Sequence, residues 1–107
     1  MFELKKNTKG GFHFTLKAKN GQVILSSEAY SSKSAAENGI ASVKKNAQDE
    51  TKFERKTAKN GKFYFNLKAG NGQIIGTSQM YASEAGMENG IDSVKNNAPG
   101  AGIGEEP

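Results

Sequence analysis

The chain has 107 residues, which is a usual length for one domain with a modest hydrophobic core. It contains no cysteine, so disulfide frameworks, thiolate metal sites and cysteine nucleophiles are excluded. Fifteen lysine and arginine residues against eleven acidic ones give a basic protein of net charge +4, which is compatible with a polyanionic partner. Because no run resembles a signal peptide or a membrane span, we expect a cytoplasmic protein without membrane contact.

The sequence repeats itself once. A shift of 51 positions aligns residues 2–47 with residues 53–98 without a gap, and about half of the aligned residues are identical. Agreement over the whole unit indicates a duplication. We therefore expect a single domain over residues 2–98, made of repeat one (2–47) and repeat two (53–98). The glycine- and glutamate-rich residues 99–107 are expected to form a disordered tail.

Each repeat begins with a pattern that predicts two strands. Phe2 and Leu4 alternate with charged residues, which is typical of a short half-buried strand. The second strand gives the strongest alternation in the chain. In repeat one, its polar side carries His13, Thr15 and Lys17, and its apolar side is rich in phenylalanine and leucine.

A third strand follows an Asn-Gly pair in each repeat. These pairs, at 20–21 and 71–72, are expected to form type I′ turns, because Asn-Gly tolerates positive φ at both central positions. The third strands are expected at residues 22–30 and 73–81. All three residues of Val23–Leu25 are apolar, so alternation does not show which side of this strand faces the core. The strand at Phe53 could pair within repeat two or across to repeat one.

A helix ends each repeat. Ser32 and Ser83 are expected N-caps, and the apolar residues after them fall at helical spacing on one face. A unit of this size buries only a small core alone, so the repeats should combine. We predict an α+β fold in which two βββα repeats form one pseudo-twofold domain. Its antiparallel sheet should have about six strands, with both helices on one face.

Three features shared by the two repeats resemble a known family. They are the Asn-Gly-Gln-(Val/Ile)-Ile hairpin, the tyrosine that ends the third strand, and the helix sequence Glu-Asn-Gly-Ile-x-Ser-Val-Lys. Over residues 2–98 they resemble the YegP-like proteins, small bacterial proteins that occur as one repeat or as a tandem pair. The resemblance implies repeats that combine into one sheet and exchange a strand. It implies no enzymatic activity, because the family has no established one to transfer.

No catalytic constellation is visible in the sequence. His13 is the only histidine, and the equivalent position of repeat two holds Tyr64. With one histidine and no cysteine, zinc sites and nucleophile–histidine pairs are effectively excluded. We therefore expect a protein that is not an enzyme and that has no cofactor and no bound metal.

Basic residues gather in the first hairpin of each repeat and indicate nucleic acid as an alternative partner. A basic sheet face with exposed rings can stack single-stranded bases. The competing interpretation is that these lysines keep the sheet soluble and block edge pairing. The candidate nucleic-acid surface consists of Lys5, His13, Lys17, Lys56, Tyr64 and Lys68.

Each predicted helix contains an internal Asn-Gly pair, although glycine there costs about 1 kcal/mol relative to alanine. Close approach of the helix to a neighbouring element is the favoured explanation. The alternative is a small-ligand or enzyme site at the pseudo-twofold, with Glu37, Asn38, Glu88 and Asn89 as candidate contacts. Taken together, the sequence favours a monomeric, non-enzymatic binding or interaction module whose partner is unknown.

Overall fold

A computed structural model of the chain describes residues 1–105. The two repeats form the same elements in the same order. Repeat one contains β1 (Phe2–Lys6), β2 (Phe12–Lys17), β3 (Val23–Ser26) and α1 (Lys33–Asn46). A short 3-10 helix, η1 (Glu50–Lys52), leads into β4 (Phe53–Thr57), β5 (Phe63–Lys68), β6 (Ile74–Thr77) and α2 (Glu84–Asn97). A further strand, β7 (Ile103–Glu105), follows.

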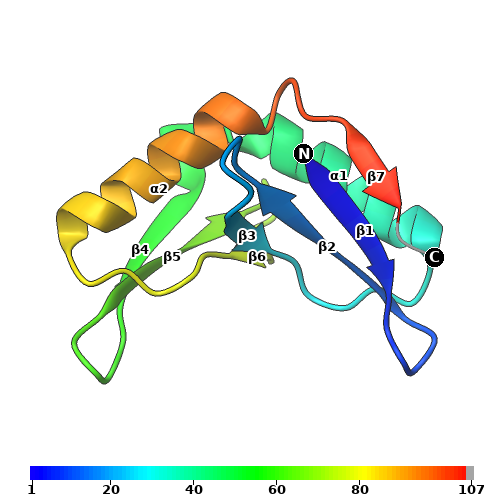
Figure 1. The fold of residues 1–107 in the computed structure, drawn as a ribbon, viewed down its shortest axis with the longest axis horizontal. Coiled ribbons are helices and arrows are strands. Elements are labelled where there is room, and N and C mark those ends of the chain that lie inside the picture. The colour runs from blue at the N-terminus through cyan, green and yellow to red at the C-terminus, as the bar shows by residue number, and fades with distance from the viewer. Residues whose placement is uncertain (106–107) are drawn as a thin grey trace.

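All seven strands belong to one sheet, in the order β4-β5-β6-β3-β2-β1-β7. The halves join through β3 and β6, which pair antiparallel at Ser26 and Thr77. Both helices lie on one face of the sheet, and Figure 1 shows the two halves related by an approximate twofold. The predicted α+β fold is therefore confirmed, although the sheet has seven strands and not about six.

The seventh strand lies in the segment that was expected to be disordered. Ile103 pairs with Phe2 in a parallel arrangement that continues to Glu105, so the sheet is mixed and not purely antiparallel. The Phe2 amide donates to the carbonyl of Gly102 at 2.9 Å. The outer edge of β1 offers unpaired backbone groups, and these give the segment partners that a free tail lacks. The rest of the predicted tail, residues 106–107, lies outside the described residues.

The strands of each repeat pair among themselves. Phe53 lies opposite Leu67, so β4 joins its own repeat and the open choice for this strand is settled. With repeat bounds of 2–47 and 53–98, no strand is exchanged, because short hairpin loops bring consecutive strands together. Each helix instead packs on strands of both repeats. Helix α1 contacts β2 of its own repeat and also β5 and β6, while α2 contacts β5 of its own repeat and also β3.

The third strand is shorter than predicted and contains a bulge. Leu16 pairs with Leu25 and Lys17 with Val23, which leaves Ile24 as an extra residue. A bulge of this kind re-aims neighbouring side chains, and both Ile24 and Leu25 are buried. The bulge explains why consecutive residues of this strand are apolar, because it lets both of them be buried.

The Asn-Gly turns differ from the type I′ prediction. In these turns only the glycines have positive φ, at +85° for both Gly21 and Gly72, and no described residue other than glycine does. The Gly21 amide donates to the carbonyl of Ala18, which closes a loop of three residues. A loop of this length needs positive φ only at its last position, so Asn20 stays in an ordinary conformation.

The glycines inside the helices make room for tyrosine rings. A Cβ atom on Gly39 would lie 2.8 Å from Cζ of Tyr30, and one on Gly90 would lie 2.6 Å from Cζ of Tyr81. Each ring also stacks on a phenylalanine of the second strand, Tyr30 on Phe14 at 6.0 Å between centroids. Burial, and secondarily the charge of Glu28, raises the pKa of Tyr30. Close packing therefore explains the glycine of each helical Asn-Gly pair.

Candidate functional site

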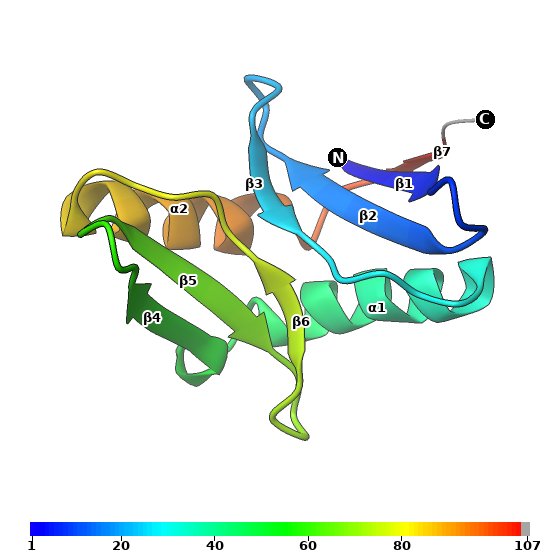
Figure 2. The same cartoon turned by 90° about the horizontal axis from the view of Figure 1, so that it is seen from below.

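The sheet face opposite the helices carries a continuous row of polar residues across six strands. Neighbouring strands place these residues directly opposite one another, and directly paired residues share a face. We call this set the polar row: Glu3, Thr15, Ser26, Thr77, Asn66 and Glu54. Figure 2 views the sheet from this side, where no helix covers it. The polar row is symmetric about the pseudo-twofold, with a glutamate at each end and hydroxyl groups in the centre.

All six residues of the predicted nucleic-acid surface lie on this same face. Lys5 pairs with His13 and Lys56 pairs with Tyr64, while Lys17 and Lys68 follow at the other end of each second strand. The alternation of the second strands dictates this, because Phe14 and Leu16 point into the core beneath the helices. We call the six residues and the polar row together the open face.

Two carboxylates that the sequence analysis did not include interleave with the lysines. In repeat one, Lys17 Nζ lies 3.0 Å from a Glu3 oxygen and Lys5 Nζ lies 3.9 Å from it. Repeat two repeats the pattern, with Lys68 at 2.8 Å from Glu54 and Lys56 at 3.8 Å. Hydrogen bonds from Lys68 and Asn66 lower the pKa of Glu54. The parity of the first strand, which turns Phe2 and Phe53 inward, could have identified both glutamates.

The two halves of the polar row are bonded differently. In repeat two, Thr77 Oγ1 donates to Asn66 Oδ1 at 2.8 Å, and Asn66 Nδ2 donates to Glu54 at 3.1 Å. In repeat one, Thr15 occupies the position of Asn66, and its buried Oγ1 has no hydrogen-bond partner among the described residues. Repeat two is therefore fixed by its own side chains, whereas repeat one retains hydrogen-bonding capacity.

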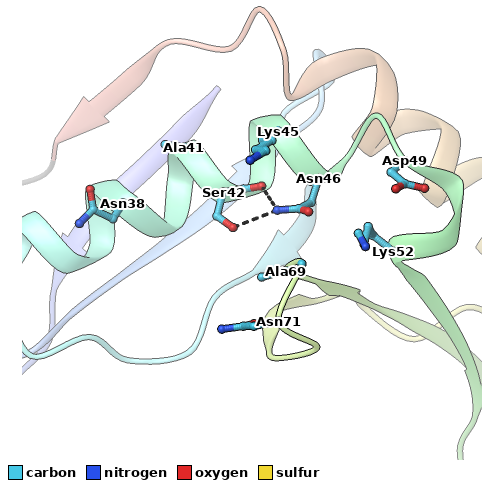
Figure 3. Close-up of a pocket in the computed structure, with 10 residues that line it drawn as sticks. Asn38, Ala41, Ser42, Lys45, Asn46, Asp49, Lys52, Ala69 and Asn71 are labelled. Atoms are coloured by element: carbon cyan, nitrogen blue, oxygen red, sulfur yellow. Dashed lines mark hydrogen bonds between the residues drawn. The ribbon is translucent and has the colours of Figure 1, made fainter.

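The four residues predicted to meet at the pseudo-twofold are not brought together. Asn38 lines a cavity between α1 and the β5–β6 hairpin, shown in Figure 3, which we call the first groove. Asn89 lines one of two adjoining cavities between α2 and the β2–β3 hairpin, which share Ala18, Asn20 and Ser93 and which we call together the second groove. Glu37 is exposed. Each helix instead leans over the hairpin of the other repeat, which separates the two asparagines.

Glu88, the fourth of these residues, belongs to an ion cluster. Arg55 donates from Nε to Glu88 at 2.5 Å and from Nη2 at 2.8 Å, and it also bonds Glu50 at 2.5 Å. Lys95 pairs with the other oxygen of Glu50. The hydrogen bond from Arg55 lowers the pKa of Glu88, and bonds from Lys95 and Arg55 lower that of Glu50. We call these four residues the Arg55 cluster; it is a set of structural ion pairs and not a carboxylate pair.

Residues 1–105 contain neither a cluster of metal ligands nor a membrane-spanning helix. In that part of the chain, no three histidine, cysteine, aspartate or glutamate side chains gather closely enough to hold a metal ion. None of the helices described there has the length and apolar character needed to cross a bilayer.

Sequence comparisons find close relatives over nearly the whole chain. A family model described as "Domain of unknown function (DUF1508)" matches residues 7–54 and again 58–105. A UPF0339 protein from the 5′ region of the ptx operon of Stutzerimonas stutzeri is 57% identical over 104 residues, which are 97% of this chain and 94% of that protein. The UPF0339 protein YegP of Escherichia coli K12 is 60% identical over 96 residues, 90% of this chain and 87% of that protein.

Two solved structures have the same fold. The solution NMR structure of yegP from E. coli, described as a protein of unknown function, has a TM-score of 0.93 at 55% identity, over 98% of this chain and 90% of that chain. A solution NMR structure of a UPF0339 protein from Shewanella oneidensis has a TM-score of 0.92 at 53% identity, over 97% and 88%. The resemblance to YegP-like proteins is thereby confirmed.

The matched segments also give another division of the repeat. The first, 7–54, runs from β2 into β4, and the second, 58–105, runs from β5 through β7. With these bounds the closing strand of the first unit, β4, pairs with β5 of the second unit. If the unit is taken to end in β4, this pairing corresponds to the strand exchange that the resemblance implied. Whether a strand counts as exchanged depends on where the unit is said to begin.

Proposed function

The chain belongs to the DUF1508 family, and on that premise we propose that it is a non-enzymatic binding module that docks a protein with an acidic surface on its open face. The observation that carries this proposal is the polar row, which runs across six strands on the side that no helix covers. Protein interfaces combine such hydrogen-bonding groups with aromatic residues, and Tyr64 stands beside the row.

The charges of the open face define the partner. Its four lysines exceed its two glutamates, so the face favours an acidic surface. A protein surface that mixes carboxylates with neutral polar groups can place the neutral groups beside Glu3 and Glu54, whereas a uniformly charged phosphate backbone brings phosphates against these carboxylates.

The absence of enzymatic activity, the cytoplasmic location and the monomeric state are part of the same proposal. His13 is the only histidine, and its directly paired neighbour is Lys5, which has no hydroxyl or thiol for the imidazole to activate. The lack of cysteine suits a reducing compartment. The covalent link between two repeats supplies within one chain the pairing that a single-repeat protein needs a second copy to obtain.

Nucleic-acid binding is the second candidate function. It is favoured by one observation: Lys5, Lys17, Lys56 and Lys68 share a face with His13 and Tyr64. The glutamates oppose it, because each lysine lies within 4 Å of a carboxylate. A continuous positive surface, which drives counterion release from nucleic acids, is therefore interrupted.

Fluorescence anisotropy with labelled single- and double-stranded DNA and RNA, at about 50 and 200 mM salt, separates the two candidates. The protein-docking proposal expects no binding in the micromolar range at either salt concentration. Micromolar binding that falls steeply with salt, and that is abolished by Lys17→Glu with Lys68→Glu, would overturn this proposal and show that the open face binds nucleic acid.

Site-specific photocrosslinking in cells then tests the protein partner directly. A benzophenone amino acid is placed at Tyr64 on the open face and, as a matched control, at Glu37, which is exposed on α1. We expect one discrete protein adduct from position 64 that Lys17→Glu with Lys68→Glu removes, and no such adduct from position 37. No adduct from position 64, or the same adduct from both positions, would overturn the proposal.

A further inference from the structure

We propose that the first groove binds a small hydroxylated phosphate of the sugar-phosphate class, independently of the open face. The groove lies between α1 of repeat one and the β5–β6 hairpin of repeat two, with a volume of about 630 Å³ (Figure 3). This volume is in the range of small-molecule sites. Seven of its ten lining residues have polar side chains, which are asparagine, serine, lysine and aspartate, and Gly70 also lines it.

A buried asparagine forms the floor of the first groove. Asn46 is only 8% exposed, and its Nδ2 donates to Ser42 at 2.8 Å to the carbonyl and 3.1 Å to Oγ. These two bonds fix the amide, as Figure 3 shows. Its Oδ1 accepts no hydrogen bond from any residue in 1–105. The oxygen is not fully enclosed, so the fixed amide presents it to the groove as an acceptor for a ligand hydroxyl.

Two lysines give the first groove its preference for an anion. Lys45 and Lys52 both line it, and Lys45 has no ion-pair partner within the described part of the chain. The one carboxylate of the lining, Asp49, accepts bonds from Thr51 N at 2.9 Å and Thr51 Oγ1 at 2.6 Å. These hydrogen bonds, with help from Lys52, lower the pKa of Asp49. The lining therefore keeps one net positive charge for a phosphate.

The remaining polar groups suit the hydroxyls of a sugar. Asn38 lines the groove from α1, and Asn71 lines it from the hairpin, where its Oδ1 already accepts from the Gln73 amide at 3.0 Å. An amide offers both a donor and an acceptor, which matches the dual character of a hydroxyl. Lysine is an established point-charge partner for phosphate. The combination selects a ligand that carries hydroxyls and one anionic group.

The second groove provides a natural control. It has the same asparagine–serine arrangement as the floor of the first groove, but the charged residues around it differ. Asn97 Nδ2 donates to Ser93 at 2.7 Å to the carbonyl and 3.1 Å to Oγ, as Asn46 does to Ser42. The position of Lys45 is held by Asn96, and that of Lys52 by Met1. A lysine, Lys19, stands instead at the hairpin position of Gly70. The second groove thus lacks the paired lysines beside its floor.

The test is a ¹⁵N NMR titration of the full chain with glucose 6-phosphate, with glucose and inorganic phosphate titrated separately. We expect saturable shifts of the Asn46 side-chain amide and of the backbone amides of Gly70 and Asn71, with dissociation constants in the millimolar range or tighter. The equivalent signals of Asn97 and Asn20 should not saturate. Lys45→Asn, which copies repeat two, should weaken binding by about tenfold.

The matched control variant is Asn96→Lys, which adds a lysine beside the second groove and should leave the affinity of the first groove unchanged. Equal shifts in both grooves, or no saturation by 10 mM glucose 6-phosphate, would overturn the proposal. Equal response to inorganic phosphate would do so as well, because it would show general anion binding by surface lysines. None of these results depends on the open face, so the failure of one proposal leaves the other intact.

Discussion

Repeat one and repeat two share a backbone plan, but they close their sheet edges in different ways. In repeat one, Leu4 is buried on the helix side of β1, and β7 covers the outer edge. In repeat two, the equivalent residue is Arg55, which is bonded to Glu88 and Glu50, and β4 is the last strand of the sheet. An edge strand with charged residues resists unwanted pairing. The two repeats thus protect their sheet edges differently. The edge of repeat one is apolar and covered by a strand, and the edge of repeat two carries ion pairs.

The centre of the molecule shows a second difference between the repeats. Leu25 of β3 corresponds to Gly76 of β6, and a Cβ on Gly76 would lie 2.7 Å from Cγ of Leu25. Two leucines would collide at the pseudo-twofold, and two glycines would leave a void. The halves are therefore complementary and no longer interchangeable, which a homodimer of either repeat could not achieve.

Changes at this central pair should have the largest effect on stability. Leu25→Ala removes a fully buried side chain and should cost about 2–5 kcal/mol in the free energy of unfolding. Gly76→Leu should cost about 1–3 kcal/mol by overpacking. Urea denaturation would measure both. The exchange variant Leu25→Gly with Gly76→Leu should recover part of the loss, whereas a strictly additive loss would contradict the complementarity.

The helical glycines come next in expected effect. Gly39→Ala and Gly90→Ala each gain about 1 kcal/mol in helix propensity, but the new methyl group meets a tyrosine ring. Overpacking of this kind costs about 1–3 kcal/mol, so we expect both variants to be less stable than the parent by thermal unfolding. Gly86→Ala is the matched control, because its Cβ would meet nothing closer than 3.3 Å. Stabilisation at Gly39 or Gly90 would contradict the packing explanation.

Local patterns predicted most of what is local in this fold. Ser32 accepts from Ala35 N, and Ser83 accepts from Gly86 N, as their positions indicated. Helical spacing likewise identified the buried helix face, including Ile40 and Val43. These features depend on residues a few positions apart, where periodicity and capping rules are strong.

Features that depend on distant partners were not predicted. The stretch around Ile103–Glu105, with glycine at 100, 102 and 104, is too rich in glycine to indicate a strand, and it becomes one only beside the edge of β1. The six lysine and aromatic residues of the open face were placed on the right side by alternation. The ion pairs of the lysines with Glu3 and Glu54 depend on the register between strands. A single sequence does not supply this register.

The Arg55 cluster should make stability depend on acid more than its apolar counterpart does. The pKa values of Glu50 and Glu88 are lowered in the folded state. Their contribution is therefore present above the ordinary glutamate pKa near 4.3 and is lost as pH falls through the lowered values. Because both side chains are about half exposed, we expect about 1 kcal/mol in total. Arg55→Leu, which copies Leu4, should flatten the stability between about pH 5 and 3; an unchanged slope would exclude the cluster as its source.

The smallest expected effect comes from transferring the hydrogen-bond chain of repeat two into repeat one. Thr15→Asn with Ser26→Thr recreates the Thr77–Asn66–Glu54 arrangement beside Glu3. A satisfied bond contributes about 0.5–1.5 kcal/mol, and the orphan hydroxyl of Thr15 disappears, so the variant should be slightly more stable than the parent in urea. If the open face docks its partner through this end of the polar row, the same variant should also weaken the adduct from position 64. A variant that is stabilised and still crosslinks at full yield would show that the partner does not use this part of the polar row.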